Sequence, residues 1–335
     1  MSDTHDPVLM MRSLAVEFTT PAARFRAVDG VSLNVERGKT LALVGESGSG
    51  KSVTTLSILG LLRPPLARIA AGEILFRGRD GRTRDLAQLD ERQMRGVRGD
   101  EIGLIFQEPM TSLNPVMTVG AQIAQAIKLH RAVSKRAAAA EAESLLRLVE
   151  IDDAARRAAS YPHQLSGGMR QRVMIAMAIA CRPVLLLADE PTTALDVTVQ
   201  AQILRLIRRL QREIGMGVLF ITHNLGVVAE IADHVAVMYG GQIVESAPVA
   251  MLFDTPRHPY TRALLASLPD PAAPHTLHRR LRVVPGQVVN PRQLPPGCRF
   301  EPRCVSAADA CRRSGPEVVA AGVGHDVRCL RWNDA

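Results

Sequence analysis

Apolar runs alternate with amphipathic stretches from the start of the chain to about residue 245. Four of these runs have the length and composition of buried strands, at 41–44, 102–106, 184–188 and 218–222. The stretch 52–62 follows the first of them and predicts a helix. Strands that alternate with helices are typical of an α/β domain.

One helix is predicted from apolar positions at helical spacing, namely Ile203, Leu206, Ile207, Leu210 and Ile214. Its other face carries Arg205, Arg208, Arg209 and Arg212. These arginines form either a basic docking surface or an ordinary solvated helix face, and we favour the solvated face.

The chain divides by composition into two predicted domains, 8–255 and 256–335. Residues 121–160 are rich in Ala, Arg and Glu without a strand pattern, so we expect an inserted helical subdomain at about 112–165. Prolines recur after residue 255 and break any long helix or strand. We therefore expect this tail to be a small second unit, separate from the first core.

Composition adds little to this picture. The chain has 335 residues, 47% hydrophobic and 22% charged, which is ordinary for a globular protein. Aromatic residues make up 3%, which disfavours stacking platforms for single-stranded nucleic acid. The net charge of +8 suits nucleic acid, an anionic membrane surface or an Arg-rich soluble protein, and the lack of a dense basic run favours the last.

The sequence predicts a cytosolic location. The N-terminus MSDTHDPVLMMRS has no basic start followed by an apolar stretch, so no signal peptide is expected. No run reaches the ~18 apolar residues of a membrane span. The five cysteines would then be kept reduced, and no disulfide framework is expected.

Two motifs predict a nucleotide site. The first is a phosphate loop, GESGSGKS, from Gly45 to Ser52, between a predicted strand and a predicted helix. Its glycines let successive N–H groups face phosphates, Lys51 supplies a positive charge, and the Ser52 hydroxyl is placed for Mg²⁺. The second is the run 184–190, where a buried strand ends in Asp189 for the Mg²⁺ shell and Glu190 as general base.

Between these motifs lies Leu-Ser-Gly-Gly-Met at 165–169, and this run resembles the signature of the ATP-binding cassette (ABC) ATPases. The resemblance covers roughly residues 8–255. It implies the ABC ATPase fold, an α/β P-loop NTPase domain with an inserted helical subdomain, here followed by a small Cys/Pro-rich extension. It also implies that Ser166, Gly167, Gly168 and Met169 act on ATP held by a second subunit.

The resemblance assigns further residues. Gln107 matches the glutamine that contacts Mg²⁺ and water, and His223 matches the switch histidine at the γ-phosphate. Phe18 is expected to stack on adenine, with Phe25 as the alternative. The loop that crosses the dimer interface is matched by Ala194, Leu195 and Asp196. The nucleotide-binding set is Gly45, Glu46, Ser47, Gly48, Ser49, Gly50, Lys51, Ser52 and Phe18. Met169 replaces the usual Gln and Asn224 the usual Asp, and neither touches the groups assigned to chemistry.

Other runs narrow the resemblance to the ATP-binding subunits of oligopeptide/dipeptide importers, a family that includes nickel importers. These runs are QEPMTSLNP from Gln107, LSGGMRQRVMIAMA from Leu165, and PRHPYTRALL from Pro256. The implied partners are a second ABC ATPase subunit, two transmembrane permease subunits and an extracytoplasmic solute-binding protein, with no nucleic acid. The implied location is peripheral, on the cytoplasmic face of the cell membrane. The alternatives are an importer of nickel or another small solute, an exporter ATPase, and a soluble ABC protein of nucleic acid or ribosomes.

Four cysteines of the tail could converge on one site, namely Cys298, Cys304, Cys311 and Cys329. Four thiolates suit Zn²⁺ or an iron–sulfur cluster, and zinc sites usually have closer pairs than these. In the resembling importer family this extension is associated in some members with a [4Fe–4S] cluster, which we expect here, with Zn²⁺ as the alternative. Arg299, Arg303 and Arg328 are expected to offset the thiolate charge. Cys181, in an apolar helix, is expected to be a buried core residue.

Overall fold

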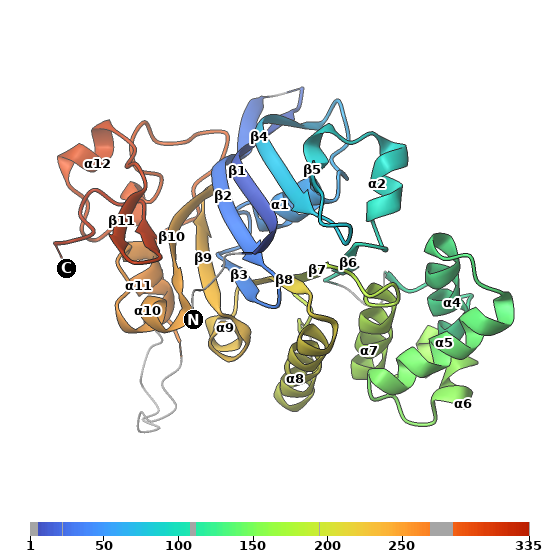
Figure 1. Cartoon of the computed structure of the whole chain (residues 1–335). Helices are drawn as coiled ribbons and strands as arrows, with labels where there is room; N and C mark the ends of the chain where they lie inside the picture. The colour runs from blue at the N-terminus through green and yellow to red at the C-terminus, as the bar shows by residue number, and fades with distance from the viewer. Residues whose placement is uncertain (1–5, 22, 108–111, 194, 269–283, 335) are drawn as a thin grey trace, which may run out of the picture. The chain divides into compact units, whose positions relative to one another are not determined.

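The chain divides into two compact units, each with dense contacts among its own residues. The computed structural model of the chain describes residues 6–21, 23–107, 112–193, 195–268 and 284–334 (Figure 1). Unit 1 consists of residues 1–10, 34–40 and 75–221. Unit 2 consists of residues 11–33, 41–74 and 222–335. The predicted domain boundaries at 8, 255 and 256 rest on sequence alone and stay a prediction.

Three parallel strands form the sheet of unit 1: β6 (Ile102–Ile105), β7 (Leu185–Asp189) and β8 (Gly217–Thr222). The central strand is β7, with Ile102 opposite Leu185 and Gly217 opposite Leu185 on its other side. Every residue of β8 is buried, as expected for a parallel strand covered on both faces. The strands predicted from the apolar runs are therefore confirmed.

The remaining elements of unit 1 are mostly helices. They are β5 (Thr83–Asp85), η1 (Leu86–Gln88), α2 (Glu91–Val97), α4 (Val119–His130), α5 (Lys135–Leu148), α6 (Ala154–Ala158), η2 (Pro162–Gln164), α7 (Gly167–Ala178) and α8 (Val197–Ile214). The helices α4 and α5 begin at Thr118 and Ser134, whose hydroxyls accept the Ala121 and Ala137 N–H groups. Helices α4, α5 and α6 lie side by side (Figure 1). The predicted helical character of 121–160 is confirmed.

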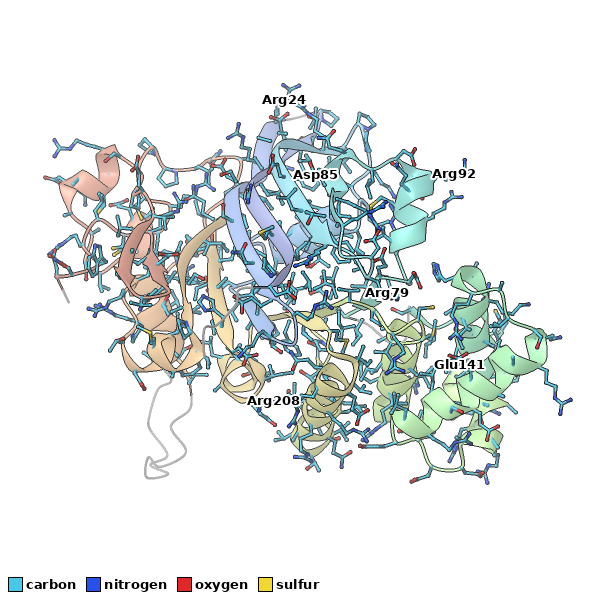
Figure 2. All side chains as sticks on the ribbon, viewed as in Figure 1. Arg24, Arg79, Asp85, Arg92, Glu141 and Arg208 are labelled. Carbon is cyan, nitrogen blue, oxygen red and sulfur yellow. The ribbon has the colours of Figure 1, made fainter. Side chains whose placement is uncertain are left out.

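Helix α8 has the two faces that its sequence predicts. Its predicted apolar positions from Ile203 to Leu210 are buried, and Gly215 ends the helix in the left-handed conformation at φ 74°. On the other face Arg205, Arg208 and Arg212 are exposed, and Arg208 is labelled in Figure 2. These exposures agree with a solvated face.

Unit 2 contains two groups of strands. One group has β1 (Pro7–Thr19) between β2 (Arg24–Glu36) and β4 (Ala67–Arg77). In the other, β3 (Thr40–Val44) runs parallel to β9 (His234–Tyr239). Antiparallel neighbours continue this second group in the order β10 (Gln242–Pro248), β12 (His325–Val327) and β11 (Val319–Gly322).

The helices of unit 2 are short. They are α1 (Lys51–Ile58), α9 (Leu225–Ile231), α10 (Val249–Asp254), α11 (Pro259–Ala266), η3 (Glu301–Arg303) and α12 (Asp309–Arg313). Helix α1 ends before the predicted position 62, because Gly60 adopts a left-handed φ of 59°. Within the described part of the chain, no helix combines the length and apolar character that a membrane crossing needs.

The C-terminal extension shares the core of unit 2, so the expectation that it would be separate from the first core is wrong. Tyr239 of β9, Tyr260 of α11 and Phe300 pack together, with ring centroids 4.7 to 5.3 Å apart. Strand β12 of the extension also pairs with β10, where Val327 lies opposite Glu245. The proline-rich composition does not indicate this packing, because the contact is made by aromatic residues that are far apart in the sequence.

A buried carboxylate fixes the start of the extension. Glu245 accepts hydrogen bonds from the backbone N–H groups of Arg257 and His258, at 2.6 and 2.9 Å. The His325 imidazole Nε2 lies 2.8 Å from the same carboxylate, and both side chains are fully buried. These partners satisfy a charge that would otherwise be costly to bury.

His258 begins helix α11 as a neutral cap. Its Nδ1 accepts the Tyr260 N–H at 3.0 Å, so its own proton must lie on Nε2. Burial, aided by the charge of Arg262, lowers the pKa of His258 to about 3. Protonation would both bury a charge and break the cap.

Acid should therefore destabilise the chain through His258. Below about pH 6.5 the histidine binds a proton in the unfolded chain but stays neutral in the folded chain. As the pH falls below 6.5, the free energy of unfolding therefore decreases by about 1.4 kcal/mol per pH unit. At pH 5 the contribution is about 2 kcal/mol. His258→Asn keeps a capping side chain without the titration, so its unfolding free energy should depend less on pH between 6.5 and 5.

Denaturant unfolding at several pH values measures this difference. His163→Asn is the matched control, since His163 is exposed, and it should follow the wild-type pH dependence. A His258→Asn variant with the same pH dependence as the wild type would contradict the assignment.

Candidate functional site

The segment 45–52 forms a tight loop between β3 and α1 of unit 2. Gly45 and Gly50 have φ values of 157° and 110°. A Cβ on Gly45 would lie 2.2 Å from the Met238 carbonyl oxygen, and one on Gly50 would lie 2.7 Å from the Ala27 carbonyl oxygen. Both positions therefore require glycine.

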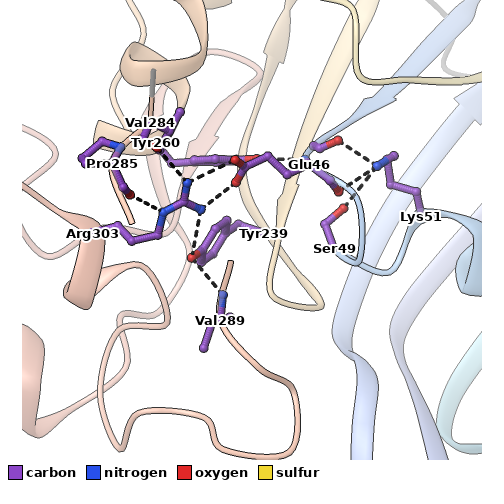
Figure 3. A network of polar contacts seen from close by, with 10 residues as sticks. Glu46, Ser49, Lys51, Tyr239, Tyr260, Val284, Pro285, Val289 and Arg303 are labelled. Carbon is purple, nitrogen blue, oxygen red and sulfur yellow. Dashed lines mark hydrogen bonds and ion pairs between the residues drawn. The ribbon is translucent and has the colours of Figure 1, made fainter. Parts of the chain in front are cut away.

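Lys51 folds back over this loop. Its Nζ donates hydrogen bonds to the carbonyl oxygens of Gly45 and Glu46, at 2.7 and 3.0 Å, and lies 3.5 Å from Ser49 Oγ (Figure 3). The side chain is almost fully buried. A positive charge is thus fixed at the start of helix α1, and helix N-termini favour phosphate groups.

Acidic and amide side chains meet at one edge of the unit 1 sheet. Asp189 ends β7, Glu190 follows it, and Gln107 lies just beyond the neighbouring strand β6. Glu190 Oε2 accepts hydrogen bonds from Gln107 Nε2 at 2.9 Å and from Thr193 Oγ1 at 3.0 Å. Glu190 also has a left-handed φ of 46°. Strained backbone of this kind concentrates at functional sites.

Thr193 is a contact that the sequence did not single out. Its only signal is its place in the short turn after Glu190, where a hydroxyl three residues on can reach back to the carboxylate. The pairing of Gln107 with Glu190, in contrast, follows from parallel strands whose carboxyl ends share an edge.

The run 165–169 forms the beginning of a helix in unit 1. Ser166 caps α7, with its Oγ accepting the Met169 N–H at 3.3 Å. A Cβ on Gly168 would lie 2.8 Å from Val199 Cγ1, so glycine allows α7 to approach α8. The glycines therefore have a packing role beside any role toward a nucleotide.

Leu195 and Asp196 begin the next helix. Asp196 caps α8 through its Oδ1, which accepts the Val199 N–H at 2.9 Å, and Leu195 Cδ2 lies 3.8 Å from the Cβ position of Gly167. Unit 1 thus brings this segment close to the run 165–169. Ala194 lies outside the described residues, as do the residues 108–111 of QEPMTSLNP.

The other predicted residues belong to unit 2. His223 follows β8 and is exposed, and Asn224 caps α9 by accepting the Gly226 N–H at 2.9 Å. Asn224 is thus a competent cap in place of the usual Asp. Phe18 and Phe25 form one stacked pair, with centroids 5.7 Å apart, and the Arg292 guanidinium lies 5.5 Å from the Phe25 centroid. The choice between them as adenine partner stays a prediction.

The described side chains thus fall into two sets. Unit 1 contains Gln107, Asp189, Glu190, Ser166–Met169 and Leu195–Asp196, and unit 2 contains Gly45–Ser52, Phe18 and His223. Their assigned roles toward ATP and Mg²⁺ stay predictions.

Comparison with known proteins shows which family the chain belongs to. Residues 28–193 match the family model described as ABC transporter, and residues 244–311 match that of the oligopeptide/dipeptide transporter C-terminal region. A Brucella melitensis protein named for peptide import ATP binding is 54% identical over 334 residues, covering 99% of both chains. The chain belongs to the ATP-binding proteins of oligopeptide/dipeptide ABC transporters.

Two further comparisons place this ABC protein more closely. The dipeptide transport ATP-binding protein DppD of Bacillus subtilis is 47% identical over 324 residues, covering 97% of this chain and 94% of the relative. A dimeric structure of the ATP-binding cassette MJ0796 bound to ADP and Pi matches with a TM-score of 0.63 and 28% identity, over 72% of this chain and 98% of the other. The predicted ABC ATPase fold is confirmed.

The four tail cysteines of this ABC protein line one pocket, together with His258 and Arg331. Burial raises the pKa of Cys298 to about 11 and also raises the pKa values of the Cys304 and Cys329 thiols. The four cysteines therefore lie around one pocket, and their role as ligands stays a prediction. Among the described residues, however, no group of three or more His, Cys, Asp or Glu side chains is arranged to hold a metal ion.

The arginines expected to offset thiolate charge point elsewhere, so that interpretation is wrong. Arg299 pairs with Asp29, Arg303 pairs with Glu46, and Arg328 donates to the carbonyl oxygens of Ile243 and Pro316. Carboxylates and buried carbonyls compete for these guanidinium groups more strongly than neutral thiols do. Cys181 is buried, as predicted.

Proposed function

We propose that this chain is the ATP-hydrolysing subunit of an ABC importer of di- or oligopeptides. The observation that carries the proposal is the similarity to a protein named for peptide import, which extends over 99% of both chains. The similarity therefore includes the C-terminal extension as well as the cassette. Many other ABC proteins share the cassette, so the extension is the more specific part of the match. An importer of nickel or another small solute is the alternative within the same family, and a soluble ABC protein of nucleic acid or ribosomes is the more distant one.

Nucleotide binding is assigned to the loop Gly45–Ser52, with Lys51 as the charge on the β- and γ-phosphates and an aromatic side chain, Phe18 or Phe25, on adenine. Mg²⁺ would be held by the hydroxyl of Ser52, the carboxylate of Asp189 and the amide oxygen of Gln107. All three supply the oxygen ligands that this hard cation prefers. Mg²⁺ would neutralise charge on the phosphate groups.

The hydrolytic step is assigned to Glu190 as general base toward the attacking water, with His223 at the γ-phosphate. Two hydrogen bonds to one carboxylate oxygen, from Gln107 and Thr193, support this assignment because they fix the direction of the Glu190 side chain. The carboxylate would then accept a proton from the attacking water in a fixed orientation.

Partners follow from the signature. Ser166–Met169 would act on ATP held by a second cassette, identical or related, so each chain contributes half of two composite sites. The ATP-binding cassette MJ0796, which forms a dimer in its structure with ADP and Pi, supports pairing of cassettes. Closure of the pair would move two permease subunits, and a solute-binding protein would deliver the peptide. The chain would lie at the cytoplasmic face of the membrane.

Replacement of the base tests the catalytic assignment. Glu190→Gln should retain MgATP binding and ATP-driven pairing of cassettes, because it keeps the size and one oxygen of the side chain. ATP turnover by the assembled transporter should fall by about 10²–10⁴-fold, the range for loss of a general base.

The matched control is Glu213→Gln in the same unit, whose exposed carboxylate lies 3.9 Å from Arg209. Turnover of that variant should equal the wild type, as measured by phosphate release in proteoliposomes. Full hydrolysis by Glu190→Gln would overturn the assignment of Glu190.

The transported solute is tested by uptake. Proteoliposomes that contain this chain, its second cassette, both permeases and the binding protein should accumulate a labelled dipeptide in the presence of internal ATP. Lys51→Ala should abolish the accumulation because the phosphates lose their bound charge. Uptake of nickel without uptake of peptide would favour the alternative importer, and no uptake with nucleic-acid-stimulated ATPase activity would favour the soluble class.

For the cysteine pocket we propose a [4Fe–4S] cluster, with Zn²⁺ as the alternative. Four thiols on one pocket are the right ligands in kind. The described residues are not arranged as a metal site. Binding would have to bring the sulfur atoms closer together. It would also have to release protons from thiols whose pKa values are raised. Bound metal would cross-link the extension, and no catalytic step is assigned to it.

Anaerobic purification decides between these ligands. A cluster should give a brown protein with about four iron and four sulfide per chain. Cys311→Ser should lose the colour, whereas Cys181→Ser, which alters a cysteine outside the pocket, should keep it. Stoichiometric zinc without iron would overturn the cluster, and protein free of both would overturn the metal site.

A further inference from the structure

A carboxylate lies within the phosphate loop, and an arginine of the C-terminal extension covers it. Glu46 Oε2 lies 2.6 Å from Arg303 Nη1, and Glu46 Oε1 lies 3.1 Å from Arg303 Nη2 (Figure 3). Two parallel N–H···O bonds of this kind form the strongest and most directional ion pair in proteins. The Arg303 side chain is 3% exposed and that of Glu46 is 28% exposed, so solvent screens the pair only in part.

Arg303 is itself fixed on every side. Its Nε donates to the Pro285 carbonyl oxygen at 2.7 Å and its Nη2 to the Val284 carbonyl oxygen at 3.3 Å. The guanidinium also lies over the rings of Tyr239 and Phe300, 5.7 and 5.9 Å from their centroids. The partners that hold Arg303 belong to β9 and to the extension, so its position does not depend on Glu46 alone.

The same extension holds the backbone of the loop. The Tyr260 hydroxyl of α11 accepts the Glu46 N–H at 3.0 Å. On the other side of the loop, the Gly241 N–H donates to the Ser49 carbonyl oxygen at 2.9 Å. Gly240, beside it, accepts a hydrogen bond from Arg299, which also pairs with Asp29. One flank of the loop is therefore bonded directly to a residue beyond 255, and the other is bonded to a turn that Arg299 of the extension holds.

Charge gives Arg303 a role beyond anchoring. A loop that binds phosphate groups works through N–H groups, a helix terminus and Lys51, all of which favour anions. The carboxylate of Glu46 opposes this preference, since a negative charge on the loop itself repels phosphate groups. Paired with Arg303, the carboxylate contributes little net charge to the loop.

We propose that Arg303 is a positioning residue for nucleotide binding, which neutralises Glu46 and fixes the phosphate loop in its anion-binding form. This inference rests on the proposed binding of MgATP to the same loop. It makes the affinity of the loop for nucleotide depend on the C-terminal extension, and it explains why a glutamate is tolerated at the second position of the loop.

Four variants of the full chain test the proposal, with a fluorescent MgATP analogue as the probe and Kd as the readout. Arg303→Met exposes the charge of Glu46 and should weaken binding about tenfold. Glu46→Gln leaves the Arg303 charge unpaired near the phosphates and should strengthen binding. The double variant has neither charge and should return close to the wild type. Arg312→Met, which removes an exposed arginine of the same extension that pairs with Glu301, should bind as the wild type does.

The dependence of Kd on ionic strength distinguishes an electrostatic role of Arg303 from a purely structural one. The deficit of Arg303→Met should shrink as ionic strength rises, because the repulsion is electrostatic. Thermal unfolding of each variant shows whether the fold is retained. Should Arg303→Met fail to fold, Arg303→Lys preserves the positive charge and should keep most of the affinity, while Glu46→Gln still tests the sign.

Three results would overturn the proposal: equal binding by Arg303→Met and the wild type, a double variant as weak as Arg303→Met, or weaker binding by Glu46→Gln alone. If the wild-type chain binds the nucleotide analogue no better than Lys51→Ala does, the proposed function is overturned together with this inference. Binding by the wild type with any of the three results would overturn the inference alone.

Discussion

The close packing of the phosphate loop against strand β9 is the constraint on which unit 2 depends. The Met238 carbonyl oxygen lies where a side chain on Gly45 would have to be, and the turn after β9 donates a hydrogen bond to Ser49. Gly45 therefore cannot carry a side chain, and the loop follows a backbone path that suits the binding of an anion by N–H groups. The same packing brings β9, and Tyr239 at its end, within reach of the C-terminal extension.

Local pattern was sufficient for the parts of the fold where each residue is determined by near neighbours. The strands at 184–188 and 218–222 and the helix at 203–214 were predictable because burial repeats with a fixed period. The phosphate loop was predictable because glycine and lysine are required at fixed spacing. The end of α1 was placed too late, since a single left-handed glycine stops the helix while apolar residues continue.

Contacts between distant segments were not predictable, and these determine what the extension does. Glu46 and Arg303 are 257 positions apart, and Asp29 and Arg299 are 270 apart. No periodicity links such pairs, because partners are chosen by which charged groups the fold buries together. Proximity in sequence therefore predicts thiols as the partners of the tail arginines, and the fold provides carboxylates for Arg299 and Arg303 instead. The carboxylates were better partners, since they are ionised and the buried thiols are not.

The turn from Cys298 to Cys304 joins two features that sequence analysis treats as unrelated. Arg299 follows the first of these cysteines and holds the turn after β9, and Arg303 precedes the last and holds Glu46. The backbone of the same turn carries thiols to the pocket and guanidinium groups to the phosphate loop. Phe300, between the two arginines, packs on Tyr239 and Tyr260 and so fixes the direction in which each set points. Because Phe300 is buried between the two arginines, one short turn determines both the lining of the cysteine pocket and the ion pairs that reach Asp29 and Glu46.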